Sequence, residues 1–203
     1  GQSNMELELQ NSDNGKWYVH NASNAMIRFY QTPRCAWLDE QALRLARESG
    51  WRVLRPDACG DISAVAYHFA VKLQQQLGIP IGIIGCNWGG TSVTCWIQEA
   101  VLQTMPEGQS YLSSYFTQLG SQTPAEGDRE EARYALLVQK WNDRVTEIRA
   151  TDASIPWEKI NANAGDYPWP PPVTYRSFKR PGGLAQTMLL RIAPFTLTGI
   201  LYY

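Results

Sequence analysis

Two short segments of the chain hold residue types that suit acyl transfer. The first is Gly1-Gln2-Ser3-Asn4-Met5-Glu6, in which a serine stands among small and amide residues. The second is Cys86-Asn87-Trp88-Gly89-Gly90-Thr91-Ser92, which follows a continuous apolar run. A serine hydroxyl needs a general base to become a nucleophile, and its tetrahedral intermediate needs donors such as backbone N–H groups. Residue chemistry alone makes Ser3 one candidate nucleophile among the many serines of the chain.

In this order the segments resemble the sialate O-acetylesterase-like family of SGNH-type serine hydrolases. In that family the nucleophile lies in a G-Q-S-N motif and the oxyanion loop reads W-G-G-T. A third stretch, from Leu184 through Ile192 to Tyr203, resembles the helix and strand that lead into the family's Q-G-E-S-N segment. The resemblance covers residues 1–10, 60–105 and 180–203 well. It implies a chain truncated at both ends, because the first strand and the Q-G-E-S-N segment fall outside it.

The resemblance implies a role for each residue of the two segments. Ser3 attacks an acetyl carbonyl, and the backbone N–H groups of Ser3 and Gly89 bind the oxyanion. Gly90 is the alternative donor, although the family's spacing of glycine, one residue, then Ser or Thr falls on Gly89 and Thr91. Gln2 and Asn4 either hold the serine loop by hydrogen bonds or line the pocket.

Aromatic residues around these segments have two interpretations each. Trp88 and Trp96 flank the oxyanion loop, as walls of a sugar pocket or as core packing. Trp157, Tyr167 and Trp169 lie in a Pro-rich region, where they either stack on sugar rings or pin the loop to the protein.

A general base is missing from the motifs of this chain. In the family the base is the histidine of a late D-x-x-H motif, and the chain contains no Asp-x-x-His. The resemblance therefore places the base beyond Tyr203. His20 in a polar loop and His68 inside a predicted helix are more typical of packed or surface histidines.

The function that the resemblance implies is removal of O-acetyl groups from a carbohydrate through an acetyl-enzyme, with no metal or organic cofactor. The substrate would be sialic acid or an acetylated plant glycan such as xylan, and the protein extracytoplasmic, either periplasmic or secreted. One alternative is a non-catalytic carbohydrate-binding relative of the same fold. Another is a serine hydrolase of a different ester, although an α/β-hydrolase requires a G-x-S-x-G frame that Ser3 lacks.

Composition narrows the class of protein and of partner. The 203 residues fit one domain, and 44% hydrophobic with 18% charged residues is ordinary for a globular protein. A net charge of −1 gives no sign of the clustered positive charge that binds nucleic acid or an anionic membrane. No apolar run approaches the roughly 20 residues of a membrane span. The oligomeric state cannot be predicted from these features.

The cysteines do not form a metal-binding pattern. There is no C-x-x-C pair among the four, and only two histidines accompany them, which argues against a zinc site. Cys35 and Cys59 lie in loop-like sequence and could form a disulfide in an exported protein. Cys86 ends an apolar run and is predicted to be a small buried hydrophobe.

The order of the predicted helices and strands that would position these residues indicates an α/β fold. We expect a three-layer α/β/α domain with a mostly parallel sheet. This domain spans residues 1–203, with a helical and Pro-rich insertion at about 105–180. Predicted strands cover 25–30, 79–85 and 196–203, the second buried on both faces as in a parallel sheet. Predicted helices cover 38–48, 63–77, 90–103, 128–149 and 183–192.

Overall fold

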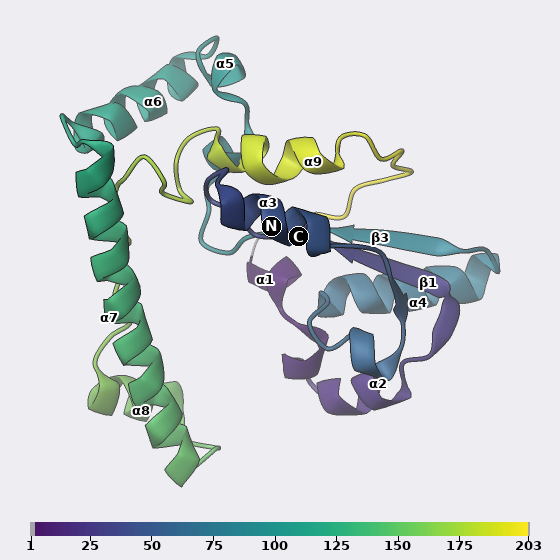
Figure 1. Cartoon of the computed structure of the whole chain (residues 1–203). Coiled ribbons are helices and arrows are strands. Elements are labelled where there is room, and N and C mark those ends of the chain that lie inside the picture. Colours follow the sequence, from purple (N-terminus) through teal and green to yellow (C-terminus); the bar gives the residue numbers. More distant parts are fainter. Residues whose placement is uncertain (1–2, 203) are drawn as a thin grey trace.

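The protein contains a small mixed β-sheet with helices around it (Figure 1), in a computed structural model that describes residues 3–202. The strands are β1 (Asn24–Gln31), β2 (Arg52–Leu54) and β3 (Ile81–Gly85), in the order β2–β1–β3. β1 pairs antiparallel with β2 and parallel with β3. The predicted α/β class is confirmed, but the prediction of a mostly parallel sheet is wrong. The strand responsible, β2, has only three residues and too short a pattern to be predicted.

The main hydrophobic core lies between this sheet and α4 (Ala64–Leu77). Ile27 and Phe29 alternate onto the core face of β1, as the twofold repeat of a strand requires, and pack with Tyr67 and Ala70 of the helix. The start and end of α4 match the prediction. The Ser63 side chain accepts a hydrogen bond from the Ala66 N–H at its start, and Gly78 ends it with φ +66°.

The opposite face of the sheet carries an aromatic group. Tyr30 of β1 contacts Trp51 and Phe195, with ring centroids 5.8 and 5.7 Å apart. The prediction that residues 79–85 are buried on both faces is wrong, because β3 is an edge strand of the described sheet and Ile81 alone among its residues is buried.

The N-terminal segment packs against the beginning of α4. It contains α1 (Ser3–Glu6), the 3-10 turn η1 (Leu9–Asn11) and α2 (Gly15–Asn21). The Leu9 N–H donates to the Ile62 carbonyl at 2.8 Å, and the Ala64 N–H donates to the Leu7 carbonyl at 2.8 Å. Leu9 is fully buried, so this segment is anchored to the core directly after Ser3.

Between β1 and β2 lies α3 (Glu40–Glu48), close to its predicted range. Its N-terminus is capped by Asp39, whose side chain accepts a hydrogen bond from the Ala42 N–H at 2.9 Å. The 3-10 turn η2 (Pro56–Ala58) follows β2.

The predicted helix at 90–103 is wrong. Its place is taken by the 3-10 turn η3 (Val93–Trp96) and the short α5 (Glu99–Leu102), separated by extended backbone at Ile97. Contacts from the C-terminal part of the chain explain the break. The Gly182 N–H donates to the Thr94 carbonyl at 2.8 Å, and the Cys95 thiol donates to the Lys179 carbonyl at 3.3 Å.

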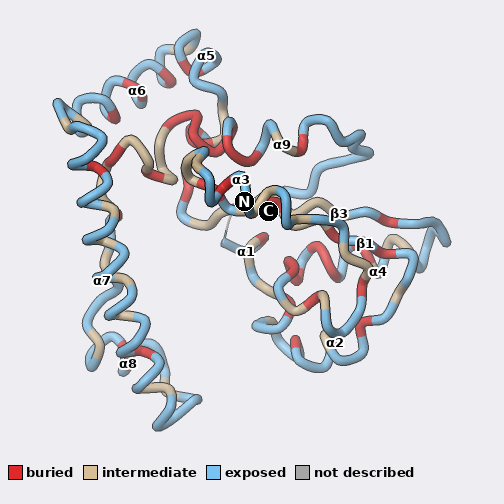
Figure 2. Tube along the Cα trace, in the orientation of Figure 1, coloured by how far each residue is buried: buried red, intermediate tan, exposed pale blue. Residues whose placement is uncertain are grey.

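A helical arm extends away from the sheet (Figure 1). It consists of α6 (Pro106–Leu119), α7 (Pro124–Thr151) and α8 (Trp157–Ala164). Most residues along α7 are exposed (Figure 2). The helix predicted at 128–149 is confirmed and is longer, because Thr123 and Glu126 form a capping box at its start. Pro106 begins α6, since proline is favoured in the first turn of a helix.

The helix predicted at 183–192 is confirmed, because residues 183–192 are helical throughout. Within it, a π-helical turn, η4 (Ala185–Leu189), continues into α9 (Leu190–Ile192). The predicted strand at 196–203 is wrong over its described part, because residues 196–202 form no strand. The preceding residue, Phe195, packs on the aromatic face of the sheet, so the chain crosses that face instead of pairing with an edge.

The cysteines are unpaired among the described residues, so the Cys35–Cys59 disulfide that the sequence left open is not formed in the structure. Both are buried, but in different surroundings. Cys59 belongs to the core beneath the sheet, whereas Cys35 lies near the charges of Asp39 and Arg191. Burial raises the pKa of both thiols.

Candidate functional site

The structure brings Ser3 and Gly89 together. Ser3 is the first residue of α1 and is exposed, and Gly89 lies in the turn that follows β3. A Cβ atom at Gly89 would stand 3.6 Å from the Ser3 Cα. The two meet where the parallel strands β1 and β3 end, the edge at which open α/β sheets place their ligands.

A carboxylate lies between these two residues. The Gly89 N–H donates a hydrogen bond to Glu6 Oε2. Glu6 Oε1 in turn pairs with Arg34 Nη1 at 2.8 Å, and Arg34 Nε donates to the Asn87 carbonyl at 3.4 Å. The sequence analysis missed both Glu6 and Arg34. Glu6 could have been noticed, because it lies within the quoted G-Q-S-N-M-E segment.

Gly90 is constrained by its own backbone conformation and by a neighbouring tryptophan ring. Its φ of +73° lies in the left-handed region that favours glycine, and a Cβ atom there would meet the ring of Trp169 at 3.3 Å. Trp169 therefore lies beside the glycine turn, although it is distant in sequence. Its side chain is 54% exposed, and the Lys179 Nζ stands 3.7 Å from its ring centroid. Burial lowers the pKa of the Lys179 ammonium.

Thr91 supports the turn from inside. Its Oγ1 donates to the Trp88 carbonyl at 2.7 Å and accepts from Trp96 Nε1 at 2.9 Å. Trp88 stacks on Phe178 with an interplanar angle of 6° and a centroid distance of 5.0 Å. Trp88 and Trp96 both pack against a second core cluster, which contains Cys95, Leu184 and Met188. Both tryptophans thus make the packing contacts expected of core residues.

The remaining residues of the serine motif contribute less to the described geometry. Gln2 lies outside the described residues. Asn4 is exposed on α1, one residue beyond Ser3.

Neither histidine is joined to Ser3 by a hydrogen bond between described residues. The His68 ring contacts Tyr18 and Tyr67, at centroid distances of 4.7 and 5.1 Å. His20 lies on α2, exposed, in a hollow that Lys16 and Pro56 help to line. The described chain therefore places no imidazole in the role of the base.

Cys86, next to the site, is a half-buried free cysteine. Burial raises the pKa of its thiol to about 11. A raised pKa disfavours the thiolate, which is the reactive form of cysteine.

Within residues 3–202, no three or more His, Cys, Asp or Glu side chains are grouped so as to hold a metal ion. No helix in the described part of the chain is both long and apolar enough to span a bilayer.

The other aromatic candidates lie on the helical arm. Trp157 stacks on Trp141 with an interplanar angle of 5°, and Tyr167 meets the same ring edge-on at 5.1 Å. Arg149 lies 4.7 Å from the centroid of Trp157. These rings pack on one another and stabilise the arm. Of the three aromatics named for the Pro-rich region, Trp169 is the one that reaches the glycine turn.

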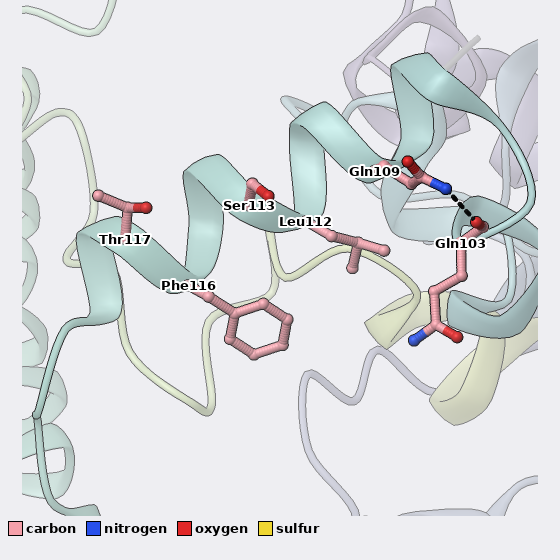
Figure 3. Close-up of a pocket in the computed structure, with 6 residues that line it drawn as sticks. All are labelled: Gln103, Gln109, Leu112, Ser113, Phe116 and Thr117. Carbon is pink, nitrogen blue, oxygen red and sulfur yellow. Dashed lines mark hydrogen bonds between the residues drawn. The ribbon is translucent and has the colours of Figure 1, made fainter.

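A separate hollow lies on α6 and the segment before it (Figure 3). Its lining residues are Gln103, Gln109, Leu112, Ser113, Phe116 and Thr117. The Gln109 amide donates to the Gln103 carbonyl at 2.7 Å. None of the residues around Ser3 lines this hollow, so it is not part of the candidate site.

Comparison with known proteins shows a partial likeness to a solved structure. No family model and no curated protein matches the chain. Among solved structures, a carbohydrate acetylesterase from Xanthomonas citri is 31% identical in sequence, with a TM-score of 0.43. The match covers 51% of this chain and 23% of that protein. The chain thus spans less than a quarter of the length of the protein it matches.

Proposed function

We propose that the protein is a serine esterase that removes O-acetyl groups from a carbohydrate. The observation that carries this proposal is the approach of the Gly89 turn to Ser3, with 3.6 Å between a Gly89 Cβ and the Ser3 Cα. A nucleophilic serine beside a turn of backbone N–H groups is the arrangement that acyl transfer requires. This proposal rests on the site geometry and motifs, and it shares its substrate class with the activity named for the Xanthomonas citri protein.

In the proposed reaction, Ser3 Oγ attacks the acetyl carbonyl and its proton passes to a general base. The negative charge that develops on the carbonyl oxygen is bound by the N–H groups of Ser3 and of the glycine turn. The alcohol of the sugar leaves with a proton, and water then cleaves the acetyl-enzyme to release acetate. Because Gly89 already donates to Glu6, its neighbour Gly90 is favoured as the second donor.

A carbohydrate substrate is supported by the aromatic surroundings of the turn. Trp169 is more than half exposed and lies against Gly90, so a sugar ring bound over Ser3 could stack on it. Whether that sugar is sialic acid or an acetylated plant glycan belongs to the proposal, as does the extracytoplasmic location.

A second candidate is a carbohydrate-binding protein without catalytic activity. It is favoured by the hydrogen bond that the Gly89 N–H already donates to Glu6, and by the contacts of the His68 ring with Tyr18 and Tyr67.

The test is active-site labelling and turnover in the intact protein. We expect a fluorophosphonate to label Ser3, and Ser3→Ala to lower acetate release from 4-nitrophenyl acetate and acetylated xylo-oligosaccharides by about 10⁴-fold or more. Ser12→Ala is the matched control, because Ser12 is in the same segment but donates to the Leu9 carbonyl. Full activity in the Ser3→Ala protein would exclude the esterase mechanism. Sugar binding without labelling or turnover would establish the second candidate.

A further inference from the structure

We infer that Glu6 is a positioning residue that fixes the glycine turn against the nucleophile. The inference rests on the proposed function, since it gives Glu6 a role in the same site. The motifs of the sequence give Glu6 no role, and acyl transfer in general requires no carboxylate at this position.

The first argument is the place of Glu6 on α1. Ser3 and Glu6 are three residues apart on a four-residue helical turn, and residues at this spacing lie on the same helix face. A Cβ atom at Gly89 would lie 2.5 Å from Glu6 Oε2 and 3.6 Å from the Ser3 Cα. One face of α1 therefore presents both the nucleophile and the carboxylate to Gly89, and a Cβ atom at residue 89 would displace the end of the Glu6 side chain.

The second argument is that both oxygens of the carboxylate are used. Oε2 accepts from the Gly89 N–H, and Oε1 pairs with Arg34 Nη1 at 2.8 Å. A hydrogen bond to a charged acceptor is stronger and shorter than one between neutral groups. The Glu6 side chain is 27% exposed, so it is partly shielded from water as well.

The third argument is that Arg34 extends the contact to a third segment. Its Nε donates to the Asn87 carbonyl at 3.4 Å, two residues before Gly89. Through one carboxylate and one guanidinium, the nucleophile helix, the segment after β1 and the turn after β3 are held together. A change in Glu6 should therefore alter the position of the turn, and with it turnover, without touching the substrate.

The first measurement is independent of activity. In protein labelled with ¹⁵N-glycine, we expect Glu6→Ala to shift the Gly89 amide resonance and to speed its hydrogen exchange at least tenfold. Glu6→Gln, which keeps an acceptor oxygen, should have a smaller effect. As a matched control, Asp61→Asn removes another 2.8 Å ion pair, with Arg52, and should leave Gly89 unchanged. An unchanged Gly89 amide in Glu6→Ala would overturn the inference.

The second measurement is the split between kcat and KM. A displacement of about 1 Å at a reacting centre can cost about 10²-fold in rate. We expect Glu6→Ala to lower kcat by about 10²-fold with KM changed less than about twofold, and Arg34→Gln to follow in the same direction. The Asp61→Asn protein should keep the parent kcat. Equal or higher kcat in a folded Glu6→Ala protein would mean that the carboxylate only blocks the turn, which overturns the inference.

The two measurements separate the inference from the proposed function. If the parent protein releases no acetate, the proposed esterase fails and the catalytic role of Glu6 fails with it, while the Gly89 amide still reports the contact. If acetate is released and Gly89 is insensitive to Glu6, the esterase stands and the positioning role is wrong.

Discussion

The position of Trp169 bears most directly on which substrate the site would bind. It lies against Gly90, whereas Trp157 packs with Trp141 on the arm. The two side chains are almost equally exposed, at 54% and 55%. Exposure alone therefore does not distinguish a candidate sugar contact from an arm residue, but proximity to the glycine turn does.

Replacing Trp169 should weaken substrate binding more than chemistry. We expect Trp169→Ala to raise KM for acetylated oligosaccharides about tenfold, which corresponds to about 1.4 kcal/mol. The kcat on 4-nitrophenyl acetate should stay the same, because this small ester has no sugar to stack. Steady-state kinetics on both substrates measures the difference, with Trp157→Ala as the control. A larger KM change in Trp157→Ala than in Trp169→Ala would refute the assignment.

The residues of the site could be predicted from the sequence only in part. Ser3 and Gly89 were chosen as partners from their motifs, and the structure places them side by side. The Glu6–Arg34 pair could not be foreseen, because it joins segments that come together only when β1 and β3 pair. The stacking of Trp88 on Phe178 depends on the same long-range packing.

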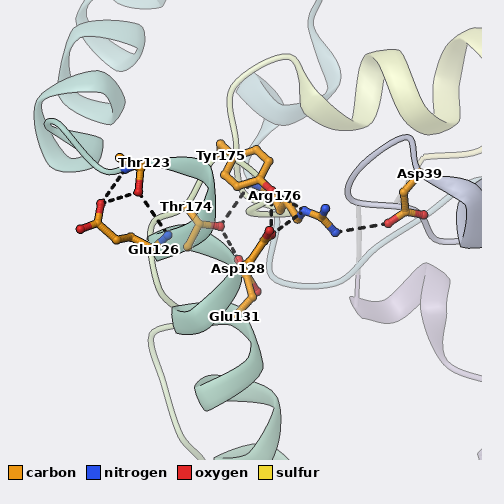
Figure 4. Close-up of polar contacts among 8 residues, drawn as sticks. All are labelled: Asp39, Thr123, Glu126, Asp128, Glu131, Thr174, Tyr175 and Arg176. Carbon is orange, nitrogen blue, oxygen red and sulfur yellow. Dashed lines mark hydrogen bonds and ion pairs between the residues drawn. The ribbon is translucent and has the colours of Figure 1, made fainter.

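At the scale of elements, the return segment 173–180 connects the arm to the sheet-bearing part (Figure 4). Arg176 pairs with Asp128 of α7 at 3.0 Å and with Asp39, the cap of α3, at 3.4 Å. Tyr175 donates to Asp128 at 2.7 Å, and the Thr174 hydroxyl donates to Glu131. These polar contacts lie near one end of α7, on a helix that is otherwise largely exposed.

Removing the charge of Arg176 should loosen this connection. We expect Arg176→Met to lower the free energy of unfolding by no more than about 1 kcal/mol, because partly exposed ion pairs contribute little. Hydrogen exchange should nevertheless speed up in the segment around Thr174 and in the first turns of α7. Urea denaturation and exchange mass spectrometry measure the two effects.

Arg133→Met is the control for this experiment. Arg133 lies on the same helix, pairs with Glu130 of that helix at 4.0 Å and is well exposed. Equal exchange behaviour in the two variants would show that Arg176 does not connect the arm.

Elements with strong local signals were predicted well. β1 has the alternation of a half-buried strand, and α4 has a serine cap, helical spacing and a terminal glycine. The failures occurred where distant contacts decide the backbone. The Gly182 N–H donates to the Thr94 carbonyl and the Cys95 thiol donates to the Lys179 carbonyl, and these bonds interrupt the helix predicted at 90–103. Packing of Phe195 on Tyr30 directs the final segment across the sheet.

At the scale of the whole molecule, buried neutral acids should make stability fall at alkaline pH. Burial raises the pKa of Cys86 to about 11, and burial and the neighbouring Tyr167 raise that of Tyr134 to about 12. Burial also raises the pKa of Tyr67 and Tyr115. In the unfolded chain these thiols and phenols lose their protons near their ordinary values of 9.0 and 10.0. The unfolded state then binds fewer protons than the folded one, so stability falls as pH rises.

We therefore expect the urea midpoint to be lower at pH 10 than at pH 8. The decline should begin near pH 9, where the unfolded thiols titrate, and Cys86→Ala should show a shallower decline. Far-ultraviolet circular dichroism at several pH values measures the midpoints. A midpoint that is constant or rising from pH 8 to pH 10 would contradict the burial of these groups.

The hydrogen bond between Gly89 and Glu6 joins residues 83 positions apart in the chain. Closing such a long loop is slow, because its entropy is lost before the contacts that compensate for it form. During synthesis Ser3 is therefore made well before the turn that faces it. A chain that ends before residue 89 contains the serine hydroxyl but lacks the glycine turn that completes the site. Whatever chemistry this site performs can begin only after β3 has joined the sheet.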